Sequence, residues 1–238
     1  MHTLSRILLL ALTPFAAQAN DCQHSPDRLL AQYEQKTQHR GENHRRDITL
    51  LRHQNQVAIR RSEHHGESVT ELWTQLPNQR ITMTRFFDNH ERGIEYQANE
   101  IKAPDWSQLE QLIDDRQIER MTLITASQDN CNKTETYSHQ DAKASMTLVW
   151  LPQQRLIKQL TVSAQGITRT LDLVHHTSSN RIEERLATLD GYQTTDYADI
   201  GDNENDSFLS KMIRLGFVSH GATGFYDADG HAIGEHNH

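Results

Sequence analysis

The chain has 238 residues, a formal net charge of −8 and an apolar fraction of 35 %. The acidic balance argues against general nucleic-acid binding and against adhesion to anionic lipid surfaces, because both rely on an excess of Lys and Arg. The low apolar fraction provides only a modest core, which favours a thin architecture such as a curved sheet with helices on one face.

Residues 1–19 have the pattern of a cleaved secretory signal peptide. A basic start is followed by an apolar run at residues 7–17, and Ala17 and Ala19 are small residues placed for the cut. The apolar run is too short to span a bilayer, and no later stretch reaches the necessary length. We therefore expect an exported, periplasmic chain that begins at Asn20 and has no transmembrane segment.

Two cysteines, Cys22 and Cys131, remain after removal of the signal peptide. An oxidising compartment favours disulfides, and the chain has no Cys-x-x-Cys pair. We therefore predict a Cys22–Cys131 disulfide; the alternative is a redox or metal-ligating thiol.

The residues after Cys22 predict a helix and then strands. Residues 25–27, Ser-Pro-Asp, combine an N-cap residue, a first-turn proline and an acid, as at the start of a helix. The residues that this helix would turn inward are Leu29, Leu30 and Tyr33. The polar and basic residues 35–46 predict a loop, and residues 47–61 predict two strands around a polar turn.

Two stretches, residues 73–85 and 150–162, share a tryptophan, Leu-Pro, two polar residues, an arginine and a strand-like run. Proline suits the second position of a tight turn, so each stretch predicts an antiparallel hairpin. Between them, residues 104–113 carry apolar side chains at helical spacing. Alternation across residues 146–173 is typical of an antiparallel sheet with one solvent-facing side. In the later hairpin, the residues expected to share one face are Leu156, Leu160 and Val162.

Helices are also predicted at residues 181–189 and 207–213, and the acidic stretch before the second allows two interpretations. Asp202, Glu204 and Asp206 have the spacing of a calcium loop, but the turn glycine and the closing glutamate are missing. We favour Asp206 as the N-cap of the following helix, with the acids near its positive end.

The expected organisation has four parts: a signal peptide at 1–19, a sheet-plus-helix domain at 20–190, an acidic segment with a helix at 191–216, and a flexible tail at 217–238. The density of Asp, Tyr and Gly in residues 192–206 also suits a docking segment for a partner protein. The tail has little apolar periodicity, so its removal is expected to leave the domain folded.

The order of these elements resembles that of the LolA/LolB-like half-barrels, the periplasmic lipoprotein carriers and their outer-membrane receptor. The residues that carry the resemblance are Trp73, Pro77, Arg80 and the hairpin at 155–173. The resemblance implies an α+β fold, in which a curved antiparallel sheet forms an open half-barrel with helices packed on one face. Helices near residues 29–33 and 109–113 would form a lid over an apolar hollow.

The leading hypothesis is a non-catalytic periplasmic carrier or accessory protein that binds an apolar or lipid-like ligand or a partner protein. No Gly-x-Ser-x-Gly motif or phosphate-binding glycine loop indicates an enzyme. The predicted ligand-binding residues are Trp73, Met83, Phe87, Trp150 and Leu160. The alternative for the tryptophans is an ordinary place in the core.

The second hypothesis is a transition-metal binding or delivery protein that acts through its C-terminal tail. His231, His236 and His238 lie close together there, and imidazole suits copper or zinc. Their spacing matches no ordered metal motif, so weak adventitious affinity is the alternative. A short hairpin that turns at Asp229 and Gly230 is expected in the same tail.

Overall fold

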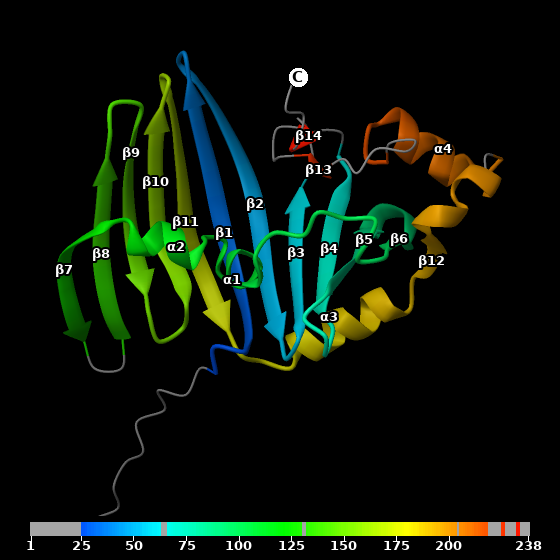
Figure 1. Ribbon diagram of the computed structural model, residues 1–238, viewed down its shortest axis with the longest axis horizontal. Coiled ribbons are helices and arrows are strands. Elements are labelled where there is room, and N and C mark those ends of the chain that lie inside the picture. Colours follow the sequence, from blue (N-terminus) through cyan, green and yellow to red (C-terminus); the bar gives the residue numbers. More distant parts are fainter. Residues whose placement is uncertain are drawn as a thin grey trace, which may run out of the picture.

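One large curved sheet organises the computed structural model, which describes residues 25–62, 66–129, 132–203, 205–218, 225–226 and 232–233. The sheet has 12 strands in the order β12-β6-β5-β4-β3-β2-β1-β11-β10-β9-β8-β7 (Figure 1). This order consists of two sequential antiparallel meanders, β1–β6 and β7–β11, that are joined side by side.

The first meander comprises β1 (Arg28–His39), β2 (Glu42–His53), β3 (Gln56–Ser62), β4 (Ser68–Gln75), β5 (Ile81–Phe87) and β6 (Arg92–Tyr96). The second comprises β7 (Thr122–Asp129), β8 (Asn132–Gln140), β9 (Ala144–Leu151), β10 (Leu156–Ala164) and β11 (Ile167–Thr177). An antiparallel ladder between β1 and β11 joins them, from Leu30 opposite Thr177 to His39 opposite Ile167. β12 (Gln193–Asp196) pairs parallel with β6 at the far edge.

The helices are short. The connection between the meanders carries α1 (Trp106–Gln111) and α2 (Asp115–Glu119), and the chain after β11 carries α3 (Arg181–Asp190) and α4 (Ser207–Arg214). Single 3₁₀ turns occur at η1 (Asp88–His90), η2 (Tyr197–Asp199) and η3 (Gly201–Asn203). Within the described residues, no helix has the length and apolar character required to cross a membrane.

The predicted helix after Cys22 and the predicted loop at 35–46 are both wrong, because these residues form β1 and β2. β1 lies in the middle of the sheet between β2 and β11, so both of its edges are paired despite its polar C-terminal half. Leu29 and Tyr33 are four residues apart, a spacing that fits one face of a strand as well as a helix. Arg40 and Gly41 turn between the strands with φ of 50° and 87°, as a two-residue hairpin requires.

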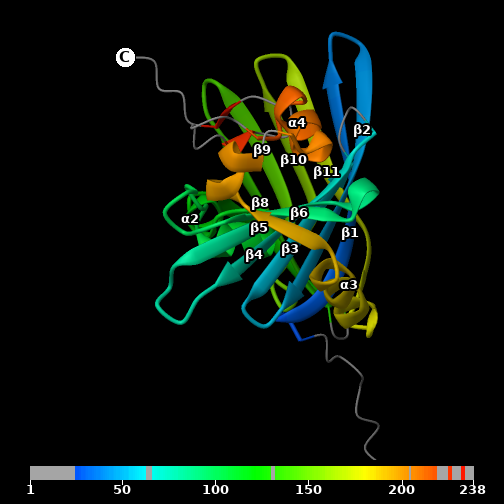
Figure 2. The same ribbon diagram turned by 90° about the vertical axis from the view of Figure 1, so that its right-hand side faces the viewer.

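The sheet has two faces, which we call the inner face and the outer face. The inner face carries Leu29, Tyr33 and Trp73, and α1 and α4 pack against it in the main core. The outer face carries Leu51 and Ala58, and α3 packs there through the buried Ile182. The expectation that helices cover one face is therefore wrong for α3. Figure 2 shows α2 and α3 on opposite sides of the strands.

Both Leu-Pro hairpins are confirmed as β4–β5 and β9–β10. In the first turn, the Gln79 backbone N–H donates to the Leu76 carbonyl at 2.9 Å, so Pro77 holds the second turn position. The expected face of β10 is wrong by one residue. A bulge between Ile157 and Gln159 places Ile157 opposite Trp150 and Leu160 opposite Leu148, so Ile157, in place of Leu156, shares a face with Leu160.

The predicted helices at the C-terminal end are confirmed as α3 and α4. The Asp206 carboxylate accepts hydrogen bonds from the N–H groups of Phe208 at 2.8 Å and Leu209 at 3.2 Å, which confirms it as the N-cap of α4. β13 (Phe225–Tyr226) and β14 (Ala232–Ile233) form the expected antiparallel pair, and its turn lies outside the described residues. The signal peptide, Cys22 and Cys131 also lie outside them, so their assignments stay predictions.

Candidate ligand-binding surfaces of the sheet

The five residues predicted to bind a ligand all belong to the inner face, but four of them are buried. Trp73 and Met83 lie directly opposite each other on β4 and β5, and Phe87 ends β5. Trp73, Met83, Phe87 and Trp150 are exposed by 2, 2, 0 and 6 %. Leu160 is half-buried at the margin of the same core.

The chain itself fills the inner face over β4 and β5. The ring of Phe87 meets Phe208 of α4 and Phe217 edge-on, each with its centroid 5.4 Å away. Phe208 and Met212 of α4 are buried in the main core. The described residues over β4 and β5 therefore form a filled core.

The inner face over β7–β11 is less covered. Its half-buried apolar side chains pack on the margin of the core: Tyr137, Met146, Leu160, Leu171 and Leu173. Leu123 lies opposite Tyr137 on the edge strand β7 and is 50 % exposed. α2 reaches over this margin, where the Gln117 amide lies 3.6 Å from the Met146 sulfur.

The outer face of the neighbouring strands β1, β2, β10 and β11 is charged. Lys36 forms an ion pair with Glu34 at 2.6 Å and with Asp172 at 3.7 Å, and Arg45 pairs with Glu34 at 2.8 Å. The Gln159 amide donates to Asp172 at 2.7 Å. Because successive side chains of a strand point to opposite faces, this charged side lies opposite the face that carries Leu160, Leu171 and Leu173.

A buried arginine links the two meanders beneath α1. Arg52 is 1 % exposed, and its Nη2 donates to the Gln154 carbonyl in the β9–β10 turn at 2.6 Å. Its Nε and Nη1 have no hydrogen-bond partner in the part of the chain that the structure describes. Burial, and then the nearby Arg155, lower the pKa of Arg52 to about 10. Arg155 is itself paired with Glu110 of α1, which ties that helix to the same turn.

A second buried network stabilises the inner face at β4 and β5. Glu71 receives Nη2 of Arg85 at 2.8 Å and Nη1 of Arg61 at 3.4 Å. Arg85 also donates to the Phe217 carbonyl at 2.7 Å. Burial alone would raise the pKa of Glu71, but Arg85 and Arg61 outweigh it and hold the pKa below its usual value.

Phe217 and Val218, the first residues of the expected tail, contact the core. Val218 is buried, and Phe217 packs against Phe87 and accepts the Arg85 hydrogen bond. Deleting 219–238 should leave the melting temperature unchanged, whereas deleting 217–238 should lower it by roughly 5–10 °C because two core side chains are lost. Thermal unfolding of the two truncated proteins measures the difference; equal melting temperatures would mean that Phe217 and Val218 contribute nothing.

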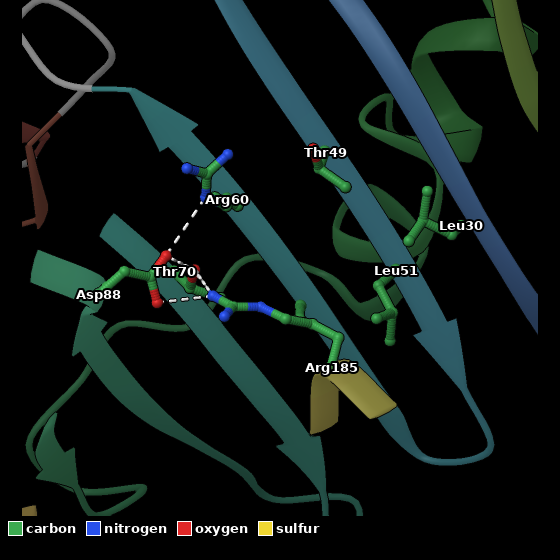
Figure 3. A pocket seen from close by; sticks show the side chains of 8 residues that line it. Leu30, Thr49, Leu51, Arg60, Thr70, Asp88 and Arg185 are labelled. Carbon is green, nitrogen blue, oxygen red and sulfur yellow. Dashed lines mark hydrogen bonds and ion pairs between the residues drawn. The ribbon is translucent and has the colours of Figure 1, made fainter. Parts of the chain in front are cut away.

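The outer face carries a pocket of about 420 Å³ between α3 and the strands β1–β4 (Figure 3). Its lining residues are Leu30, Thr49, Leu51, Ala58, Arg60, Thr70, Asp88 and Arg185. No sequence motif indicated this site, because its charged residues lie on β3, η1 and α3 and are far apart in the chain. Asp88 follows directly after β5, a position that motif searches do not recognise.

The three histidines predicted to bind copper or zinc, His231, His236 and His238, lie outside the described residues, so that site stays a prediction. Within the described ranges, no group of three or more His, Cys, Asp and Glu side chains is placed to hold a metal ion.

Comparisons with known proteins find no matching family model and no matching curated protein. The solved structures to which the chain is similar include a putative outer membrane lipoprotein-sorting protein domain from Vibrio parahaemolyticus, with a TM-score of 0.31 and 6 % identity over 70 % of this chain and 94 % of that one. A DUF1329 family protein from Desulfovibrio piger gives a TM-score of 0.34 and 8 % identity over 68 % and 91 %.

The complex of MucA and MucB from Pseudomonas aeruginosa gives a TM-score of 0.30 and 12 % identity over 64 % of this chain, which spans about half, 53 %, of the matched chain. A lipoprotein-sorting domain is thus among the similar structures, as the LolA/LolB-like sequence pattern predicts. Similarity at these TM-scores carries no function over to this chain, so its function is argued from its own residues.

Proposed function

We propose that the protein is an exported, non-catalytic carrier or accessory protein that holds an apolar chain against the inner face of its sheet, over β8–β11. The observation that supports this is the half-buried apolar surface formed by residues such as Tyr137, Met146 and Leu160, on strands whose outer side carries polar residues such as Thr136, Thr147 and Thr161. An apolar ligand that covers this surface gains about 25 cal/mol for each Å² removed from water.

The segment that carries α2 is suited to act as a lid over this surface, whereas α1 is held to the core by Leu109 and by the ion pair of Glu110 with Arg155. α1 has six residues and is followed by the C-cap residue Leu112, whose φ is 61°, and α2 has five residues. The ion pairs of Arg116 with Asp105 and Asp114 are largely exposed, so solvent screens them and they hold α2 only weakly. Displacement of α2 would extend the apolar surface past Met146. The other expected lid segment, residues 29–33, is part of β1 and has no such role.

The test is the uptake of a fluorescent acyl probe together with the urea midpoint of the same samples. Leu160→Glu should reduce probe affinity at least tenfold, because it places a carboxylate among the alkyl contacts. Its midpoint should fall only moderately, since water reaches the half-buried position. Two variants are matched controls. Leu148→Glu, directly opposite and fully buried, should prevent folding, and Thr161→Glu, on the outer face of β10, should alter neither quantity.

Two results would overturn the proposal. One is a wild-type protein that takes up no probe while Leu160→Glu is as destabilised as Leu148→Glu, since Leu160 would then lie in an ordinary core. The other is probe uptake that Leu160→Glu leaves unchanged, which would place the ligand elsewhere on the molecule.

A further inference from the structure

The outer-face pocket contains two arginines that share a single carboxylate. Arg185 Nη2 donates to Asp88 Oδ1 at 2.6 Å and to Thr70 Oγ1 at 2.9 Å, and Arg60 Nε donates to Asp88 Oδ2 at 3.2 Å. Figure 3 shows both side chains reaching the Asp88 carboxylate, Arg60 from above and Arg185 from the right. Asp88 is the only acid among the lining residues, so the formal charge of the lining is +1.

The Asp88 carboxylate has no capacity for further donors. Besides the two arginines it accepts from Ser68 at 3.2 Å, from Thr70 at 3.3 Å and from Tyr192 at 3.5 Å. A carboxylate offers about four lone-pair sites, so the groups that donate to Asp88 outnumber the sites that can accept from them. The terminal nitrogens of Arg60 donate to no atom of the described residues, and its side chain is 43 % exposed.

The rest of the lining is apolar except for Thr49 and Thr70. Leu51 and Ala58 are buried beneath α3, and Leu30 lies beside them on β1. Thr49 forms the half-exposed margin on β2, as Figure 3 shows. A volume of about 420 Å³ falls at the lower end of the range for small-molecule pockets, which suits a short chain.

We propose that this pocket binds a small amphipathic monocarboxylate, with its carboxylate on Arg60 and Arg185 and its alkyl tail on Leu30, Leu51 and Ala58. The planar guanidinium group matches a carboxylate with two parallel hydrogen bonds. One negative charge neutralises the +1 lining, whereas a cation would be repelled by both arginines and a dianion would leave an excess charge. The sheet separates this pocket from the inner face, so the proposal is independent of the carrier function.

The test is calorimetric titration with decanoate below its micellar concentration. We expect saturable binding of one decanoate per chain. Thr49→Trp fills the margin of the pocket, and Arg60→Gln removes the terminal guanidinium nitrogens of Arg60. Each substitution should weaken decanoate binding at least tenfold. Matched controls on the same face lie outside the pocket: Thr170→Trp on β11 and Arg45→Gln on β2 should bind decanoate as the wild type does.

Decyltrimethylammonium, 1-decanol and decyl phosphate test the headgroup. All three should bind at least tenfold more weakly than decanoate. Equal binding of the alcohol would show that the arginines do not select the ligand, and tighter binding of the phosphate would show a preference for a dianion; either result overturns the proposal. Decanoate binding that is absent, or that Thr49→Trp and Arg60→Gln leave unchanged, also overturns it. If Leu160→Glu abolishes decanoate binding while Thr49→Trp and Arg60→Gln retain it, decanoate binds at the inner face. That result would overturn the pocket proposal and leave the carrier proposal intact.

Discussion

Trp73→Ala is expected to lower the free energy of unfolding by about 3–5 kcal/mol, the cost of removing a large aromatic side chain from a filled core. Trp73 is 2 % exposed, lies opposite Met83, and belongs to the core that α4 covers. Urea denaturation measures the loss. Trp106→Ala is the control, because Trp106 is only half-buried at the start of α1 and its removal should cost much less.

The same variant distinguishes a core residue from one that lines a ligand cavity. A side chain that faces an open cavity leaves little additional void when it is shortened, so its loss mainly affects binding. If Trp73→Ala lowers the free energy of unfolding by less than about 1.5 kcal/mol and also reduces probe uptake, Trp73 lines the binding surface. That result would contradict a filled core at this position.

Glu71→Gln is expected to destabilise the protein by about 3–5 kcal/mol, because it leaves a buried guanidinium without its counter-charge. The side chain of Arg85 is 8 % exposed and that of Glu71 17 %. Glu34→Gln is the matched control. Its partners Lys36 and Arg45 are half or more exposed, so solvent screens these pairs and the loss should be much smaller than for Glu71→Gln. Equal effects of the two substitutions would contradict the structural role of Glu71.

The pKa of Glu71 determines how acid changes the stability of the protein. Its folded-state pKa lies below the usual value of 4.5, since the pull of Arg85 and Arg61 exceeds the effect of burial. The stabilisation is therefore complete above the unfolded-state pKa and is lost as the pH falls from about 4.5 through the folded-state pKa. Urea midpoints measured from pH 7 to pH 3 should decline less steeply for Glu71→Gln, and an identical decline would exclude this contribution.

The hairpins at Pro77 and Pro152 could be predicted because a Leu-Pro turn between alternating strands is a local signal. β1 could not, because only one of its two partner strands, β2, is near in sequence, and the other, β11, lies far along the chain. Leu29 and Tyr33 fit a helical face and a strand face equally well when no partner strand is known.

The inner-face residues could be identified from the sequence, but the part of the sheet that stays uncovered could not. The period of two separates the two faces of each strand, yet Trp73 is a core residue only because other parts of the chain pack over its face. The outer pocket was beyond prediction for the same reason. Arg60, Asp88 and Arg185 meet only because α3 crosses the face opposite to the one expected.

The ladder between β1 and β11 also determines the order in which the protein can fold. Within each meander, every strand pairs with its neighbour in sequence, so hairpins can form from local contacts within microseconds. The contact between Leu30 and Thr177 instead closes a very long loop, and such contacts slow folding. One edge of β1 stays unpaired until β11 has been synthesised. The strand that is made first is therefore among the last to be completed, and a chain that stops short of β11 exposes an open edge at what should be the middle of the sheet.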